Sequence, residues 1–411
     1  MSLSRTSVSR TPLSRPLLTR PRRLAFAALS VLPLLALTAC GSGTADAQAG
    51  ATGQVDAPAA EAGGPLDLSD VCPATVVMQQ DWQPEAEHGA MYSLVGPDLT
   101  VDTDTKSVTG SLVAQGVDTG VDVEVRPGGP NVNFQPVPSL MYLDDSILLG
   151  AVTTDAQITA LADNPVVTVA SMLTTSPQIV MWDPESHDGA ETIKEAAADG
   201  DPVVSSGDVF PRLLAAQGII DDAQIDLSYE GTPQRFVSDP AVLQQGFATA
   251  EPYIYENEIP QWGKPVGYQL LADVGYSVYP EALAVRADKV EENADCLAKL
   301  VPVMQQAQID YLDDPQATNE LIVDLVDQYQ TGWTYSLGVA DFSVQAQKDL
   351  DLVVDDPASG VFGRIDPDRM TEIVDTFAPI LVDAGQIESP DIEPESLYTN
   401  EFTDDTISMG S

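Results

Sequence analysis

The stretch ATVVMQQDWQPEAEHGAMY, residues 74–92, decides the fold class of this chain. It begins with the apolar run Ala74–Met78, which is typical of a buried strand, and continues through polar residues toward a helical pattern. Helical stretches separate further short apolar runs, which lie at 121–125, 147–152, 178–182 and 282–285. This alternation predicts α/β layers and disfavours a helical bundle or an all-β sandwich.

The order of these runs predicts two α/β lobes. We expect residues 67–175 to form the first part of lobe I, residues 176–274 to form lobe II, and residues 275–411 to return to lobe I. The last part is mainly helical in pattern, so the C-terminal third should consist of helices. Open α/β sheets bind ligands at strand ends, which predicts a ligand cleft between the lobes and makes Thr154, directly after the run 147–152, a candidate.

The first 39 residues are typical of a cleaved secretory signal. All six basic residues before position 40 are arginines, and the apolar run that follows is too short to span a bilayer comfortably. Leu37-Thr38-Ala39-Cys40 resembles a bacterial lipobox, in which the cysteine becomes the lipidated first residue. The alternative is an ordinary signal peptide with a chance cysteine. Residues 40–66 are then a lipid anchor and flexible tether, since their small and polar residues cannot bury a core.

The composition limits the classes of function. The 411 residues carry 18 Lys and Arg against 63 Asp and Glu, a formal net charge of −45. That charge repels phosphate backbones and anionic lipids, so nucleic acid is excluded as a partner. The sequence contains no G-x-S-x-G, P-loop or H-E-x-x-H motif, and its two histidines lack metal-ligand spacing. We therefore predict no enzymatic activity, catalytic residue, cofactor or metal site.

Two cysteines remain once Cys40 is assigned to the lipid. Cys72 and Cys296 lie far apart in the sequence, but outside the cytoplasm two cysteines commonly pair. We expect a disulfide between them. Two buried free thiols are the alternative, because sequence alone does not establish that the pair lies within bridging distance.

The candidate ligand-binding residues combine aromatic rings with hydrogen-bonding groups. They are Trp82, Glu85, His88, Tyr92, Thr154, Ser205, Ser206, Glu251, Tyr253 and Tyr255. The rings offer stacking surfaces, and the carboxylates can accept hydrogen bonds from amino groups. Each candidate also has a purely structural interpretation: Trp82 in a core, His88 on the surface, Ser205 and Ser206 as a helix cap, and Glu251 in a solvated turn.

Residues 80–92 resemble the D-W-x-P-N-x-x-H-x-G-x-Y opening of the ABC-transporter substrate-binding proteins for thiamine pyrimidine precursors, a branch of the nitrate, sulfonate and taurine group. Residues 123–129, 150–155 and 244–253 resemble further segments of that family. The chain departs from the pattern at Glu85, where the family has Asn, and at 96–110, where a polar hairpin replaces the first helix. The resemblance implies a two-lobe periplasmic-binding-protein-like fold.

The resemblance also implies a function. The protein would be a monomeric lipoprotein on the outer face of the cell membrane that captures a small flat nitrogen heterocycle, such as a thiamine pyrimidine precursor. It would deliver this solute to an ABC transporter permease. The alternatives are a nitrate or alkyl sulfonate binder, favoured by Ser205 and Ser206 but not by the lack of Arg and Lys in the pocket segments, a pyrimidine-forming synthase-like enzyme, and a structural lipoprotein without a pocket.

Overall fold

The computed structural model describes residues 57–410 except Asp208 and Glu230. The predicted signal peptide, the lipidation site Cys40 and the first part of the tether therefore lie outside the described residues. Within the described ranges, no helix combines the length and the apolar character needed to cross a membrane.

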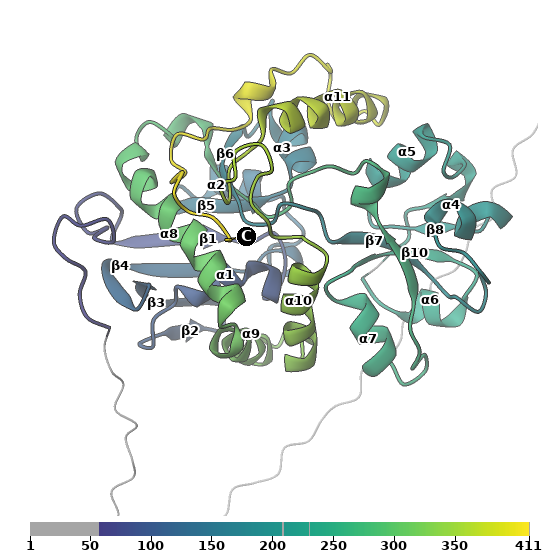
Figure 1. Cartoon of the computed structure of the whole chain (residues 1–411), viewed down its shortest axis with the longest axis horizontal. Helices are drawn as coiled ribbons and strands as arrows, with labels where there is room; N and C mark the ends of the chain where they lie inside the picture. Colours follow the sequence, from purple (N-terminus) through teal and green to yellow (C-terminus); the bar gives the residue numbers. More distant parts are fainter. Residues whose placement is uncertain (1–56, 208, 230, 411) are drawn as a thin grey trace, which may run out of the picture. The chain divides into compact units, whose positions relative to one another are not determined.

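The first sheet has seven strands in the order β2-β3-β4-β1-β5-β12-β6 (Figure 1). Its strands are β1 Thr75–Gln79, β2 Thr100–Asp102, β3 Ser107–Ala114, β4 Val117–Arg126, β5 Ile147–Val152, β6 Val166–Ser171 and β12 Ala282–Arg286. β1 pairs in parallel with β4 and β5, whereas β12 is antiparallel to both β5 and β6. All six residues of β5 are buried, which explains why a continuous apolar run predicts this central strand.

The second sheet has five strands in the order β11-β7-β10-β8-β9. Its strands are β7 Gln178–Trp182, β8 Val203–Val204, β9 Ile225–Asp226, β10 Leu243–Phe247 and β11 Gly267–Leu270. β7 is antiparallel to both β10 and β11, so this sheet is also mixed. The chain enters it through residues 172–177 and leaves it through 271–281, which we call the second crossing. The two sheets confirm the predicted two-lobe α/β fold.

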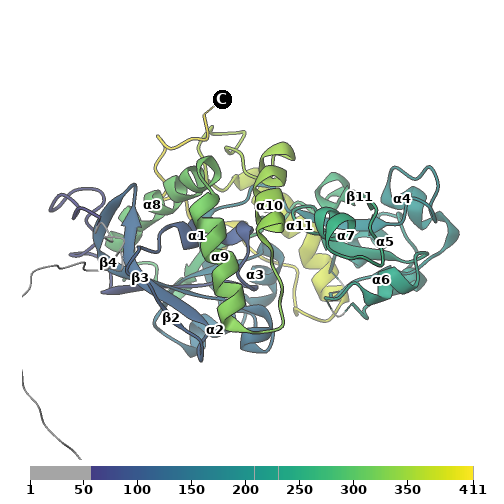
Figure 2. The same ribbon diagram turned by 90° about the horizontal axis from the view of Figure 1, so that it is seen from below.

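The C-terminal third is helical, as predicted. It contains α8 Ala294–Asp313, α9 Gln316–Tyr329, α10 Leu337–Asp349 and α11 Pro367–Asp383. The α8 and α9 helices pack against α1, and α9 packs against α10 (Figure 2). The other helices are α1 Gly89–Ser93, α2 Val137–Leu143, α3 Thr154–Ala160, α4 Ile193–Ala196, α5 Val209–Ala216, α6 Gln234–Ser238 and α7 Glu251–Asn257. Single turns lie at η1 Ala86–His88, η2 Gly129–Val132, η3 Ala197–Asp199, η4 Asp222–Gln224, η5 Leu271–Val274, η6 Ala287–Lys289 and η7 Pro394–Ser396.

The cysteine pair is bridged, which confirms the predicted disulfide. Cys72 lies just before β1 and Cys296 lies in the first turn of α8, with 4.7 Å between their Cα atoms. The side chain of Cys296 is buried in the core of lobe I. The bridge therefore joins the segment that leads into the sheet to the longest helix that covers it.

Part of the predicted tether is structured. The backbone N–H of Ala60 donates to the carbonyl of Asp118 at 2.8 Å, and the N–H of Asp118 donates to that of Pro58 at 2.9 Å. Lys299 Nζ donates to the carbonyl of Gly64 at 2.9 Å. The composition of this stretch predicts a flexible chain, but the free backbone groups at the start of β4 provide hydrogen-bond partners that composition does not reveal.

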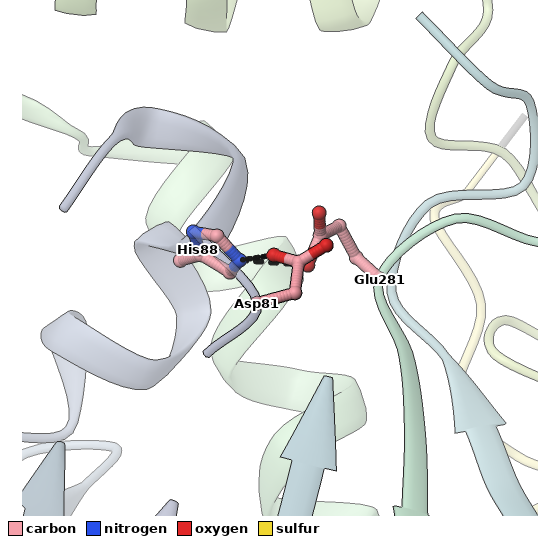
Figure 3. Close-up of side chains that lie close together, drawn as sticks. All are labelled: Asp81, His88 and Glu281. Atoms are coloured by element: carbon pink, nitrogen blue, oxygen red, sulfur yellow. Dashed lines mark hydrogen bonds and ion pairs between the residues drawn. The ribbon is translucent and has the colours of Figure 1, made fainter. Parts of the chain in front are cut away.

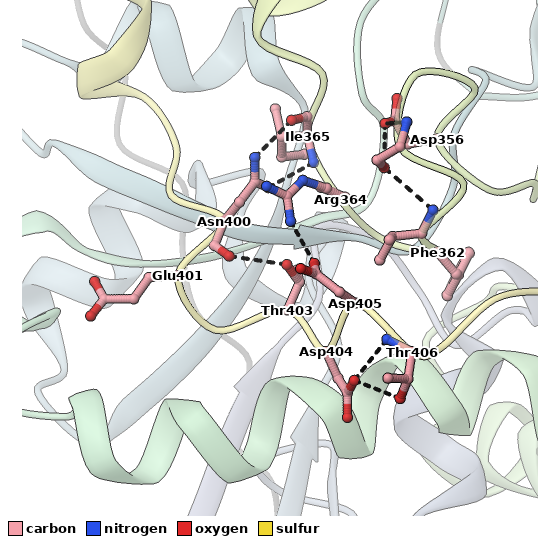
Figure 4. A network of polar contacts seen from close by, with 12 residues as sticks. Asp356, Phe362, Arg364, Ile365, Asn400, Glu401, Thr403, Asp404, Asp405 and Thr406 are labelled. Carbon is pink, nitrogen blue, oxygen red and sulfur yellow. Dashed lines mark hydrogen bonds and ion pairs between the residues drawn. The ribbon is translucent and has the colours of Figure 1, made fainter.

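The C-terminal tail is held to lobe I by polar contacts (Figure 4). Asn400 Oδ1 accepts a hydrogen bond from the N–H of Ile365 at 2.9 Å, and its Nδ2 donates to the carbonyl of the same residue at 2.8 Å. Arg364 forms an ion pair with Asp405 at 2.6 Å. Tail backbone groups also bond to β6, where the N–H of Thr168 donates to the carbonyl of Leu397 at 2.9 Å.

Candidate functional site

The segment after β1 positions the first group of candidate residues. Asp81 and Trp82 follow the C-terminal end of the strand, and the single turn η1 continues directly into α1. His88 therefore ends η1 and Tyr92 lies in α1, and both side chains are buried. His88 is only 3% exposed, so the alternative of a surface histidine does not hold.

His88 lies between two carboxylates. Its Nε2 atom is 3.1 Å from Oδ1 of Asp81 and 2.7 Å from Oε2 of Glu281, which directly precedes β12 on the second crossing (Figure 3). Burial by itself lowers the pKa of His88, but the two carboxylates outweigh it and raise that pKa well above its usual value. The imidazole is therefore positively charged at neutral pH.

Three further acids surround this group. Glu85 and Glu87 come from the same turn as His88, and Glu251 begins α7 in lobe II. Burial, followed by the charge of Glu87, raises the pKa of Glu85 well above its ordinary value. The pKa of Glu251 rises to about 7, mainly through burial, with a further contribution from Glu87. The two lobes therefore present facing carboxylates to each other.

We call these five residues, Asp81, Glu85, Glu87, Glu251 and Glu281, the acid cluster. In the described part of the chain, the ion pairs of the cluster join Asp81 and Glu281 to His88 and supply no lysine or arginine. Burial, and then the charge of Asp81, raises the pKa of Glu281 as well. Five carboxylates share a single buried cation, which makes the cluster a strongly attractive environment for a positively charged ligand.

A close approach of backbone and side chain orients Glu251. Its Oε2 atom accepts a hydrogen bond from the backbone N–H of Phe247 at 2.6 Å, so the carboxylate folds back over the end of β10. The side chain lies across Gly246, where an added Cβ would come within 3.0 Å of Glu251 Cγ. A glycine at this position therefore leaves room for the carboxylate.

Aromatic rings form a wall beside the cluster. The ring centroid of Trp82 lies 6.0 Å from that of Phe134 and 6.2 Å from that of Trp333. A cavity of about 160 Å³ is lined by Asp81, Trp82, Phe134, Val152 and Thr153, among others. Asp81 thus belongs both to the acid cluster and to the wall of this cavity. The side chain of Phe134 is 67% exposed, which leaves its ring available for contact.

Several predicted site residues have partners inside their own lobe. Tyr92 donates from its hydroxyl to Gln80 Oε1 at 2.9 Å, and Thr154 Oγ1 accepts from the N–H of Tyr279 at 3.1 Å. Ser205 donates to the carbonyl of Gly207 at 2.8 Å, while Ser206 donates from its N–H to Gln245 Oε1 at 3.0 Å. Because α5 begins at Val209, neither serine occupies the position directly before that helix.

The two candidate tyrosines of α7 lie on different faces of that helix. Tyr255 is buried, accepts a hydrogen bond from Gln244 Nε2 at 3.1 Å and packs against Phe236. Tyr253 packs against Phe342 of α10, with 5.6 Å between the ring centroids. The structure therefore brings Trp82, Glu85, His88 and Glu251 together and engages the other candidates in packing or internal hydrogen bonds.

Sequence reasoning missed five residues of this region: Asp81, Glu87, Phe134, Glu281 and Trp333. Asp81 and Glu87 lie inside the quoted stretch 74–92, where the density of acids was an available signal. The other three come from distant parts of the chain, and their local sequence contains nothing that points to the site.

No protein-family model and no curated protein matches this chain. Its structure is similar to a ligand-binding component of an ABC-type import system from Staphylococcus aureus with zinc bound, at 11% identity and a TM-score of 0.47, over 82% of this chain and 99% of that one. It is also similar to the periplasmic aliphatic sulphonate binding protein SsuA from Escherichia coli (12% identity, TM-score 0.49, 79% and 92% of the two chains). A third similar structure is the periplasmic nitrate-binding protein NrtA from Synechocystis PCC 6803 (13% identity, TM-score 0.47, 80% and 87%).

Proposed function

We propose that the protein is the solute-binding component of an ABC importer and that its solute is a small flat nitrogen heterocycle with amino groups, such as a thiamine pyrimidine precursor. The observation that supports this proposal is the acid cluster, in which Glu251 of lobe II faces Glu85 and Glu87 of lobe I beside the Trp82 ring. The resemblance of residues 80–92 to the thiamine-precursor branch points to the same class of solute.

The geometry suggests how such a solute would be held. Its ring would stack on Trp82, and its amino groups would donate hydrogen bonds to Glu85 and Glu251. Hydrogen bonds to charged acceptors contribute about 1.5–3 kcal/mol each. A positively charged or amino-bearing solute would also relieve the repulsion between Glu87 and Glu251, which come from different lobes. Solute binding would then favour the approach of the two lobes.

The alternative solutes are less compatible with this site. Nitrate and alkyl sulfonates are anions, and proteins recognise them through arginine, lysine or free N–H groups. The acid cluster repels them, and the Ser206 N–H that might have received an anion already donates to Gln245. The structure offers no specific observation that favours an anionic solute.

Calorimetric titration of the purified protein tests the proposal with three probes: an aminopyrimidine thiamine precursor, nitrate and an alkyl sulfonate. We expect binding of the aminopyrimidine alone, and a loss of about 10- to 150-fold in affinity in Glu251→Gln, the equivalent of one charged hydrogen bond. Glu256→Gln is the matched control, because Glu256 lies on the same helix and is exposed. Binding of an anion in place of the aminopyrimidine would refute the proposed solute.

We also propose that a lipid on Cys40 holds the protein at the outer face of the cell membrane, as the lipobox at residues 37–40 indicates. Acyl chains on that cysteine would supply the membrane affinity. Replacing Cys40 by serine should release the folded protein from the membrane fraction. If Cys40→Ser still fractionates with membranes, the anchor lies elsewhere.

A further inference from the structure

Three potential metal ligands meet beyond the end of β1. Nε2 of His88, Oδ1 of Asp81 and an oxygen of Glu281 all lie within 4.8 Å of one another (Figure 3). The two distances from His88 Nε2 to these carboxylates are 3.1 Å and 2.7 Å. Two ligand atoms that each lie about 2.1 Å from a metal ion are about 3.0–3.4 Å apart at octahedral or tetrahedral angles. Small side-chain movements would therefore allow all three groups to bind one ion.

The surrounding protein supplies too few hydrogen-bond donors for these carboxylates. His88 has one N–H at Nε2, which bonds to Asp81, and Oε2 of Glu281 is buried and accepts no hydrogen bond from the described residues despite its proximity. The neighbouring Glu87 is 7% exposed, and its buried Oε2 likewise has no hydrogen-bond partner among those residues. Unpaired buried carboxylate oxygens are costly, so the site favours a ligand with positive charge.

The chemistry of the three groups indicates which ion would fit. One imidazole nitrogen with two carboxylate oxygens suits Zn²⁺, Mn²⁺ or Fe²⁺. Ca²⁺ and Mg²⁺ prefer shells made of oxygen alone, so the histidine selects against them. A set of only three protein ligands leaves coordination positions open for water or another small ligand.

We propose that Asp81, His88 and Glu281 bind one divalent transition-metal ion beside the cavity that Asp81 and Trp82 line. The ion takes the place of the proton on Nε2 of His88, and that proton passes to solvent. The proposal differs from the sequence-based expectation of no metal site, because Glu281 is remote in the sequence and no local motif contains the three ligands. It rests on these three residues and not on the identity of the solute.

The position of Glu281 gives such an ion a mechanical consequence. Glu281 lies on the second crossing, whereas Asp81 and His88 belong to the segment after β1. A bound ion would join the crossing directly to lobe I. The contact would restrict the crossing close to the point where the chain returns from lobe II.

Metal titration of the full-length protein, stripped with a chelator and free of any affinity tag, tests the proposal. The probes are Zn²⁺ and Mn²⁺, with Mg²⁺ as the comparison, and the readouts are bound metal by equilibrium dialysis and the unfolding temperature. We expect one equivalent of Zn²⁺ or Mn²⁺ and a higher unfolding temperature, since a ligand that binds the folded state stabilises it. We expect no comparable effect of Mg²⁺.

Variants separate this site from general attraction to an acidic surface. His88→Gln, Glu281→Gln and Asp81→Asn should each lower the metal affinity by more than about tenfold, whereas the exposed Glu256→Gln should not. Asp81→Asn keeps the test decisive if a buried variant misfolds, because the Asp81 side chain is 34% exposed. Absent binding, or unchanged affinity in folded Asp81→Asn and His88→Gln, would overturn the proposal. Failure of Glu251→Gln to affect solute binding would leave the metal result intact.

Discussion

At the scale of single residues, Glu251 has the clearest consequence for the behaviour of the protein. Its carboxyl group is held at the end of β10 by the N–H of Phe247, yet burial and the facing Glu87 raise its pKa from 4.5 to about 7. A folded-state pKa above the unfolded value means that the folded protein binds the proton more tightly. The stability that this group contributes is therefore present below about pH 4.5 and is lost as the pH rises through about 7.

Replacement of Glu251 by glutamine should remove this pH dependence. Raising the pH from about 5 to 8 should destabilise the wild type relative to Glu251→Gln by on the order of 2 kcal/mol, since one pKa unit corresponds to about 1.4 kcal/mol. Urea unfolding at both pH values and constant ionic strength measures the difference. Glu256→Gln on the exposed face of α7 should follow the wild type. A constant difference between wild type and Glu251→Gln would contradict the raised pKa.

At the scale of elements, α8 connects the N-terminal segment to the core of lobe I. The disulfide from Cys72 to Cys296 closes a loop across 224 positions of sequence. Nearby, Lys299 of the same helix donates hydrogen bonds to the backbone carbonyls of Gly64 and Asp67 at 2.9 Å and 2.6 Å. These contacts hold the segment before β1 against the helix.

Loss of the disulfide should lower the free energy of unfolding by about 2–5 kcal/mol, because the bridge restricts the unfolded chain. Urea unfolding of the wild type with and without reductant measures this loss. The double variant Cys72→Ser with Cys296→Ser should match the reduced wild type and should not respond to reductant. Equal unfolding midpoints for the oxidised and reduced wild type would show that the bridge does not contribute to stability.

At the scale of the whole molecule, α7 of lobe II contacts α10, which follows α9 in the C-terminal region. The Tyr253 ring packs on Phe342, and an added Cβ at Gly338 would lie 2.1 Å from the Tyr253 hydroxyl oxygen. Ser336, directly before α10, also donates a hydrogen bond to Glu258, directly after α7. This contact bears on how closely the lobes approach, although the residues involved lie outside the acid cluster.

Gly338→Ala should loosen the contact between α7 and α10, because the new methyl group and the Tyr253 hydroxyl would occupy the same space. We expect a larger radius of gyration by X-ray scattering and weaker solute binding. Adding Tyr253→Ala should produce no further loss beyond that of Tyr253→Ala alone, since the clash is then removed. Gly207→Ala is the control, as a Cβ there meets no atom within 4 Å. An unchanged radius of gyration in Gly338→Ala would show that this contact does not hold the lobes.

The sequence by itself determined features that depend on local pattern. The apolar runs at 147–152 and 178–182 coincide with β5 and β7, because buried strands require consecutive apolar residues. The two cysteines that remain beside Cys40 were enough to predict the bridge. The stretch 74–92 located Trp82, Glu85 and His88 because these residues lie close together in the chain.

Only the tertiary structure decided which distant residues complete the site. The sequence suggests an alternation of acid and aromatic residues at 251–255, but this segment is helical, so Tyr253 and Tyr255 lie on different faces. Glu281 reaches His88 because β12 inserts between β5 and β6, and Trp333 reaches Trp82 through the path between α9 and α10. Such contacts depend on strand order and helix packing across the whole chain, and local periodicity contains no information about either.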